Sequence, residues 1–183
     1  MLTLGDATRF LYTQTIHMQS PAIHLLLHNI RSAHNVGALL RTAEGCGAHS
    51  VLFVGYTPHL RRDNDPRLPH IIEKAERAIA KTALGAEAML TTRYAKNLSE
   101  AISPFRKRNV PVVALEQSPN AIKLHDFQPP EEIVLVLGNE VTGIEPNDLG
   151  LVDACLEIPM LGQKESHNVA AAGAMALHWL RFH

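Results

Sequence analysis

Short apolar runs alternate with stretches of helical periodicity along this chain, and this alternation restricts the possible folds more than any other feature of the sequence. The apolar runs predict strands at residues 22–28, 50–55, 88–94, 110–116, 133–137 and 155–158. The intervening patterns predict helices at residues 35–46, 68–84, 98–108, with an interruption near Pro104, and 166–179. Strands that alternate with helices form parallel sheets. We therefore expect an α/β fold, with an open, mostly parallel sheet and helices on both faces.

The chain reads as one domain preceded by a short arm. Its 183 residues are enough for one substantial core, and Ser20-Pro21 marks a boundary. We predict an N-terminal arm at residues 1–20 and a single domain at residues 21–183. No run reaches the length of a membrane span, and the first residues lack the pattern of a secretion signal. We therefore expect a cytoplasmic protein with no membrane partner.

Composition excludes several classes of protein. The formal net charge of −1 gives no overall attraction to nucleic acid, so such a partner would need a local basic patch. Two cysteines in separate segments do not form a disulfide scaffold. His24 and His28 are four residues apart, but in a predicted strand rather than on one helical face, and no Cys/His cluster occurs. No metal site is expected.

Three loops that follow predicted strands are the candidate ligand loops, at residues 29–35, 138–144 and 160–166. In open α/β sheets ligands bind beyond the carboxyl ends of the strands. The common nucleotide motifs GxGxxG and GxxxxGK[ST] are both absent. Asn35 and Ser166 are the predicted N-caps of the helices that follow two of these loops. Gly138 and Gly162 would let the backbone approach a ligand closely.

Three segments together resemble the motifs of one enzyme family. NVGALLRTA (35–43), VLGNEVTGI (136–144) and IPMLGQKESHNVAAA (158–172) are similar to the three motifs of the SpoU, or TrmH-like, branch of the SPOUT methyltransferases. The resemblance runs from about residue 22 to the last residue. It implies transfer of a methyl group from S-adenosylmethionine to a ribose 2′-hydroxyl in tRNA or rRNA. It also implies a deep C-terminal trefoil knot and a homodimer with sites near its interface.

The resemblance assigns S-adenosylmethionine to the ends of three strands and the last motif. The residues implied are Leu115, Glu116, Gln117, Leu137, Gly138, Asn139, Ile158, Met160, Gly162, Ser166, Asn168 and Val169. Methyl transfer to oxygen is an in-line displacement, so the protein mainly has to hold the two reactants together and help a proton leave. No metal is required for this reaction.

Arg41 is the first candidate for catalysis. In a helix starting at Asn35, positions 37, 38 and 41 share a face, so Gly37 and Ala38 would leave Arg41 room to reach the active loop. A guanidinium is effectively always protonated. We therefore expect Arg41 to bind a phosphate of the substrate and to stabilise the developing alkoxide, and a role as a general base stays open.

The other catalytic candidates are Asn35, Glu140, Ser166 and Asn168. Glu140 would order its loop, hold Arg41 or favour the cationic sulfonium. Ser166 and Asn168 would bind the substrate ribose or order the cofactor loop. The third motif departs from the usual Ser-Leu-Asn-Val-Ser at His167 and Ala170, and a histidine at that position would be either a packing substitution or a proton acceptor.

RNA contacts are predicted at Arg31, His34, Arg61 and Arg62, with Arg106, Lys107 and Arg108 as further candidates. Many relatives carry a separate N-terminal RNA-binding domain, which about twenty residues cannot supply. Substrate choice would then come from the catalytic domain, its dimer partner or the arm.

Two other functions remain open at this point. One is a non-catalytic RNA-binding or assembly factor that keeps the knot. The other is a methyltransferase that acts on a nucleobase or a small molecule. A methylation assay and the mapping of the methyl group separate these alternatives from ribose methylation.

Overall fold

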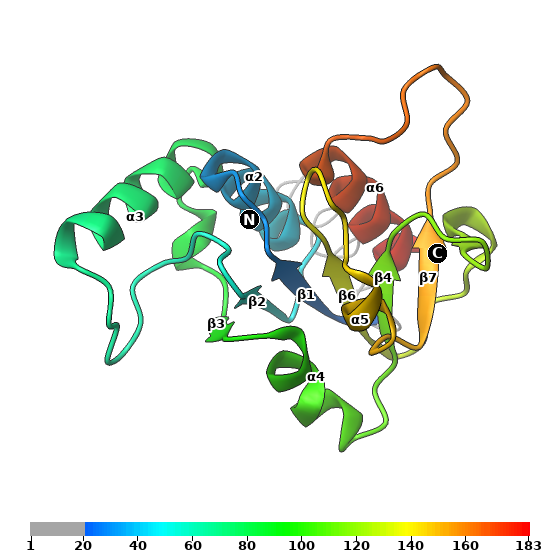
Figure 1. Ribbon diagram of the computed structural model, residues 1–183, viewed down its shortest axis with the longest axis horizontal. Coiled ribbons are helices and arrows are strands. Elements are labelled where there is room, and N and C mark those ends of the chain that lie inside the picture. The colour runs from blue at the N-terminus through cyan, green and yellow to red at the C-terminus, as the bar shows by residue number, and fades with distance from the viewer. Residues whose placement is uncertain (1–20) are drawn as a thin grey trace, which may run out of the picture.

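One seven-stranded sheet forms the centre of the computed structural model, which describes residues 21–183. The strand order is β3-β2-β1-β6-β4-β7-β5, and every neighbouring pair is parallel. The expected open parallel sheet is therefore confirmed (Figure 1). The arm predicted at residues 1–20 lies outside the described residues.

The strands are short, and the most apolar ones lie in the middle of the sheet. They are β1 (Ala22–His28), β2 (Ser50–Val54), β3 (Thr92–Ala95), β4 (Val112–Leu115), β5 (Ile122–Lys123), β6 (Glu132–Leu137) and β7 (Ala154–Glu157). The strand predicted at residues 88–94 begins only at Thr92, because a 3₁₀ turn, η1 (Ala86–Ala88), occupies its first residues. The two-residue edge strand β5 was not predicted.

Helices lie in most of the longer connections between strands and after the last strand. They are α2 (Ala33–Gly45), α3 (Pro69–Ala83), α4 (Leu98–Arg106), α5 (Pro146–Leu149) and α6 (Val169–Phe182), with a second 3₁₀ turn, η2 (Leu124–Asp126). The predicted interruption at Pro104 is wrong, since α4 continues through it. Proline removes one amide donor and fixes φ at a helical value, so near a helix end it costs little and the helix ends two residues later.

Helices cover both faces of the sheet, as expected (Figure 1). In β1, Ile23, Leu25 and Leu27 point to a core that they share with α2 and α6. Leu26 points the opposite way, to a second core that includes Leu98 and Ile102 of α4. This alternation is the period-two pattern of a strand buried on both faces.

Both predicted helix caps are wrong by a few residues. Ser32 caps α2, because its hydroxyl accepts the Asn35 N–H at 3.3 Å. Asn168 caps α6, and its side-chain oxygen accepts the N–H of Ala170 at 2.8 Å. Both helices begin with a residue of the expected chemical type, but Asn35 lies inside the first turn of α2 and Ser166 precedes the cap of α6. The side chain of Asn35 is thereby free for contacts with other segments.

Helix α2 is packed closely on two sides. A Cβ on Gly37 would collide with the Ile79 carbonyl oxygen and the Thr82 hydroxyl of α3, and one on Gly173 of α6 would collide with Leu39. These glycines bring α3 and α6 close to α2. Within residues 21–183 no helix combines the length and the apolar character needed to cross a membrane.

Candidate active site

A cavity of about 280 Å³ opens beyond the carboxyl ends of β4, β6 and β7. The residues predicted for the cofactor that line it are Leu115, Glu116, Gln117, Leu137, Gly138, Asn139, Ile158, Met160, Ser166 and Val169. Residues from three loops that are far apart in the sequence therefore surround one space, at the edge of the sheet where ligands of open α/β folds bind. Its volume is near the lower end of the range for small-molecule sites.

Two residues predicted for the cofactor do not line this cavity. Gly162 belongs to the exposed loop at residues 161–167, in which the Leu161 side chain is 99% exposed. This loop stands away from the body of the protein between β7 and α6 (Figure 1). Asn168 instead borders an adjoining open hollow.

Several lining residues were not predicted for the cofactor. Those with polar side chains are Glu140, Glu157, Glu165 and His167. The sequence suggests Glu140 and His167 for other roles, and it suggests no role for Glu157 and Glu165. Glu157 is the last residue of β7, and Glu165 directly precedes the third-motif serine; these positions are the sequence signal that identifies them.

The Glu116 carboxylate fastens two of the loops around the cavity. Its oxygens accept the N–H of Gln117 and the N–H of Ile144, each at 3.0 Å. Gly143 has a φ of +64°, and a Cβ there would collide with Glu116. A Cβ on Gly138 would lie 2.6 Å from Ile144. These glycines are thus required by contacts within the protein, whereas the sequence suggested only contact with a ligand for Gly138.

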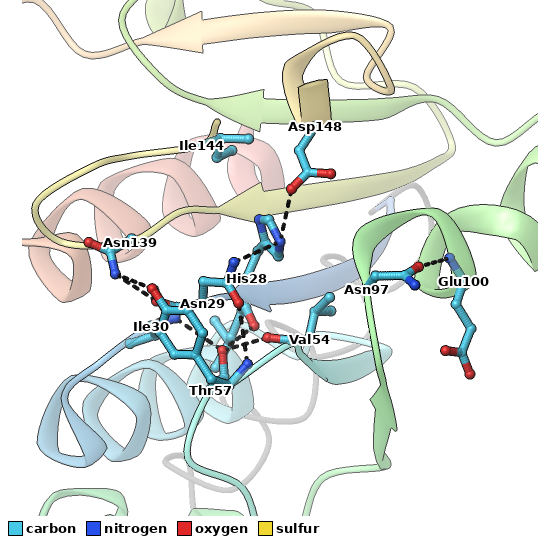
Figure 2. A network of polar contacts seen from close by, with 12 residues as sticks. His28, Asn29, Ile30, Val54, Thr57, Asn97, Glu100, Asn139, Ile144 and Asp148 are labelled. Atoms are coloured by element: carbon cyan, nitrogen blue, oxygen red, sulfur yellow. Dashed lines mark hydrogen bonds and ion pairs between the residues drawn. The ribbon is translucent and has the colours of Figure 1, made fainter. Parts of the chain in front are cut away.

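Asn139 holds the second-motif loop against the end of β1. Its side-chain oxygen accepts the N–H groups of Val141 and Thr142, at 2.8 and 3.0 Å. Its amide nitrogen donates to the Asn29 carbonyl at 2.9 Å and to the Tyr56 hydroxyl at 2.8 Å. Figure 2 shows Asn139 pointing toward Asn29, beside the Thr57 contacts that join the ends of β1 and β2. With the side chain only 7% exposed, this turn is firmly placed.

Glu140 binds the beginning of α2. Its carboxylate accepts the N–H of Arg31 at 2.8 Å, the N–H of Ser32 at 3.0 Å and the Asn35 side-chain amide at 2.9 Å. Burial opposes ionisation, but these hydrogen bonds outweigh it and hold the pKa of Glu140 below its ordinary value. Of the three roles predicted for Glu140, the contacts agree with ordering of the loop, and its partner is Asn35 rather than Arg41.

A chain of hydrogen bonds joins the three motifs. Asn35 donates to Glu140 through its amide nitrogen and accepts from the Asn168 amide at 3.3 Å through its oxygen. These three side chains, with Arg31 and Ser32, border the open hollow. Glu140 also lines the cavity, so the two spaces adjoin at this carboxylate.

Arg41 is not brought to the cavity by the described part of one chain. It is exposed on α2, borders neither the cavity nor the hollow, and has no ion pair within residues 21–183. The predicted path past Gly37 is wrong, because that face of α2 packs against α3. The catalytic role of Arg41 stays a prediction.

The predicted RNA contacts divide into two groups. Arg31 borders the hollow, and His34 is exposed in the first turn of α2. In contrast, Arg61 pairs with Glu76 at 3.8 Å, and Arg62 stacks over the Tyr94 ring at 4.3 Å. Of the further candidates, Arg106 donates to the Leu151 carbonyl, Arg108 pairs with Glu132, and Lys107 is exposed beside them.

The histidines of β1 make protein contacts instead of a metal site. His24 lies between Ser50 at 2.7 Å and Glu132 at 2.9 Å. His28 points toward Asp148 of α5, at 3.3 Å (Figure 2). Burial lowers the pKa of both histidines, against the opposing effect of their carboxylate partners. Within residues 21–183 no group of three or more potential ligands is placed to hold a metal ion.

Comparisons with known proteins agree with the fold and the motifs. The sequence profile of the SpoU rRNA Methylase family matches residues 22–178. The tRNA (guanosine(18)-2′-O)-methyltransferase of Escherichia coli K12 is 24% identical over 160 residues, which cover 87% of this chain and 63% of that protein. The protein of the same name from Thermus thermophilus is 26% identical over 175 residues, covering 94% and 80%.

Solved structures give the same result. An rRNA methyltransferase from Sinorhizobium meliloti matches with a TM-score of 0.69 at 26% identity, over 90% of this chain and 57% of that one. The chain therefore spans less than two thirds of both the E. coli protein, at 63%, and this structure.

Proposed function

Because the chain belongs to the SpoU rRNA Methylase family, we propose that it transfers a methyl group from S-adenosylmethionine to a ribose 2′-hydroxyl of tRNA or rRNA. The observation that carries the proposal is the hydrogen-bond chain Glu140–Asn35–Asn168, which joins the three motifs between a cavity and a hollow. The names of the E. coli and T. thermophilus relatives, both tRNA 2′-O-methyltransferases, support the ribose as acceptor.

The cavity fits S-adenosylmethionine chemically. Leu115, Leu137 and Ile158 provide an apolar wall suited to an adenine ring. Glu116, Glu157 and Glu165 also line the cavity, and carboxylates favour a ligand that carries sulfonium and ammonium charges. When bound, this cofactor supplies an electrophilic methyl group on a positively charged sulfur. The predicted cofactor-binding residues that line the cavity keep that role in the proposal, and the contacts of Gly162 and Asn168 with the cofactor stay predictions.

The hollow is the place we propose for the acceptor ribose. Asn35 and Asn168 present side-chain amides there, held by Glu140 and by the start of α6. These groups would orient the 2′-hydroxyl toward the cavity and thereby reduce the entropic cost of reaction. Arg41 would stabilise the developing alkoxide as the hydroxyl proton leaves. Arg31, which borders the hollow, would bind a phosphate of the RNA.

A homodimer is part of the proposal. Ala171, Met175, His178 and Phe182 form an exposed stripe along α6, with Met175 38% and Phe182 45% exposed. Because one chain leaves Arg41 away from the hollow, a second copy packed on this side would complete the site. Sedimentation equilibrium should give twice the mass of one chain at micromolar concentration. A monomer that methylates RNA would contradict the dimer.

The trefoil knot, the single domain at 21–183, the cytoplasmic location and the lack of a resident metal are further predictions from the sequence.

The proposed activity is tested by incubating the protein with radiolabelled S-adenosylmethionine and unmodified tRNA or rRNA, followed by nucleoside mass spectrometry. A 2′-O-methyl nucleoside in one pool is the expected result. Label on a base would favour nucleobase methylation. If the cofactor binds and neither RNA is labelled, the non-catalytic RNA-binding factor or a small-molecule methyltransferase becomes the better interpretation.

We predict that Arg41→Ala abolishes methyl transfer and leaves cofactor affinity nearly unchanged, because Arg41 does not line the cavity. Single-turnover transfer and calorimetric titration with S-adenosylmethionine measure the two effects. Arg93→Ala, which removes an exposed arginine on β3, is the matched control and should keep full activity. Normal turnover of Arg41→Ala would remove Arg41 from the mechanism.

A further inference from the structure

One face of α3 carries a row of exposed cationic or titratable side chains. His70, Lys74, Arg77 and Lys81 are all exposed. Their spacing of four, three and four residues places them in line along a helix, one above the other. We call these four residues the α3 stripe. At a rise of about 1.5 Å per residue, it extends for roughly 16 Å.

The α3 stripe lies opposite the buried side of the helix. Ile72, Ile79 and Ala83 are the buried residues of α3, about half a turn away from the stripe. Glu76 is on the flank, where it accepts the Arg61 N–H at 2.9 Å and pairs with the Arg61 guanidinium. Glu73 lies about 60° around the helix from the stripe. The stripe therefore presents a net positive charge to solvent.

The stripe begins next to the proposed ribose site. Thr82, the residue after Lys81, donates to the His34 carbonyl in the first turn of α2 at 2.8 Å. That first turn carries Asn35, which borders the hollow. From this contact α3 extends outward from the sheet (Figure 1). A polymer whose reacting unit occupies the hollow can continue along the helix.

The other basic residues suggested for RNA are less available. Arg61, Arg62, Arg106 and Arg108 are each engaged with groups of the protein itself. With a formal net charge of −1, the chain offers no general attraction to RNA, so a local patch has to supply it.

We propose that the α3 stripe binds the sugar-phosphate backbone of the substrate RNA outside the reacting nucleotide. This inference rests on the proposed function and adds a surface that the sequence did not suggest. Phosphate contacts position a nucleic acid without reading its sequence. The stripe therefore contributes affinity for the RNA and leaves the chemical step to the cavity and the hollow.

The test compares two variants of equal charge change. Lys74→Gln/Lys81→Gln removes two cations of the stripe, and Lys96→Gln/Lys123→Gln removes two exposed lysines outside α3 that border neither the cavity nor the hollow. The probes are an unmodified tRNA transcript pool and unmodified rRNA fragments. Affinity is measured across a salt series, together with KM and kcat for RNA and the affinity for S-adenosylmethionine.

The stripe variant should bind RNA roughly tenfold more weakly at low salt and lose about 1.5 from the slope of log affinity against log salt. KM for RNA should rise with kcat and cofactor affinity unchanged. Lys74→Arg/Lys81→Arg keeps the charges and should restore binding, which a fold defect would not allow.

Two results would overturn the inference alone: wild-type RNA affinity in the stripe variant, or an equal loss in both lysine variants. Failure of the wild-type protein to bind either RNA would overturn both the stripe and the proposed function.

Discussion

The Glu140 carboxylate is stabilised in its ionised form by two effects at the start of α2. It accepts hydrogen bonds from Arg31, Ser32 and Asn35. It also lies at a helix N-terminus, where the aligned peptide dipoles favour negative charge. Glutamine has the same shape but is neutral. It would offer these three donors only one acceptor oxygen, and its own NH₂ group would face some of them. The site is therefore held together by a charge as well as by shape.

We predict that Glu140→Gln lowers the free energy of unfolding at pH 7 by roughly 1–3 kcal/mol, because N–H groups lose their acceptor. The lowered pKa of Glu140 means that its stabilisation is present above the ordinary carboxyl pKa and is lost as the pH falls through the folded value. The difference from wild type should thus shrink in acid. Urea unfolding at pH 7 and pH 3.5 measures it, with exposed Glu131→Gln as control. A constant difference would contradict the assignment.

The sequence selects Asn35 as a candidate site residue but does not give its contacts. Both Ser32 and Asn35 are good N-cap residues, and nothing nearby ranks them. The deciding partner of Asn35 is Glu140, which reaches it only because β6 pairs with β1. Strand order is a property of the assembled sheet, so this contact was not predictable from residue spacing.

At the scale of elements, α2 is the central helix of its face, between α3 and α6. Gly37 allows α3 to approach α2 closely, and Gly173 does the same for α6. The Thr82–His34 bond is at the same α2–α3 contact. The position of α3, and with it the direction of the α3 stripe, therefore depends on the absence of a side chain at Gly37.

We predict that Gly37→Ala destabilises the protein by about 1–3 kcal/mol, because the new methyl group collides with backbone of α3 that cannot move aside. Gly45→Ala is the matched control on the same helix, where an added Cβ meets nothing within 4 Å. It should be neutral or stabilise by up to about 1 kcal/mol. Thermal and urea unfolding of the two variants compare them directly. Equal stability would mean that α2 and α3 separate easily.

Elements were predictable from sequence in proportion to their length and apolar content. Residues 22–28, 50–54 and 133–137 are mostly apolar runs, and the strands there agree with prediction to within one residue. β5 pairs through only two residues and α5 has a single turn, so neither has enough residues to show a period. Their existence depends on the neighbouring β7 and on the second core, respectively.

At the scale of the whole molecule, three buried histidines among residues 21–183 are a source of sensitivity to acid. His24, His28 and His59 are each at most 6% exposed, and burial lowers the pKa of all three. The unfolded chain takes up protons first as the pH falls below about 6.5, the ordinary histidine pKa. The contribution of these histidines to stability is therefore fully present above that pH. It decreases as the pH falls toward their lowered pKa values in the folded protein.

We predict that the free energy of unfolding decreases between pH 7.5 and pH 5.5. His59→Phe should reduce the slope, since His59 lies between the rings of Phe53 and Tyr94 and a phenyl ring cannot take up a proton. Urea unfolding at several pH values gives the slopes for both proteins. The same slope in both would exclude His59 as a contributor, and no decrease in the wild type would exclude all three.

The order of the strands also determines when during synthesis the cavity can form. The pairing of β1 with its neighbour β6, in which Leu25 lies opposite Leu135, cannot form until β6 has been synthesised. The cavity walls come from residues 115–117, 137–143 and 156–172, all in the later part of the chain. Proteins emerge from the ribosome N-terminus first. A nascent chain thus has no complete ligand pocket until α6 has been made, and a product that stops before Asn168 lacks both a cavity wall and the link between the motifs.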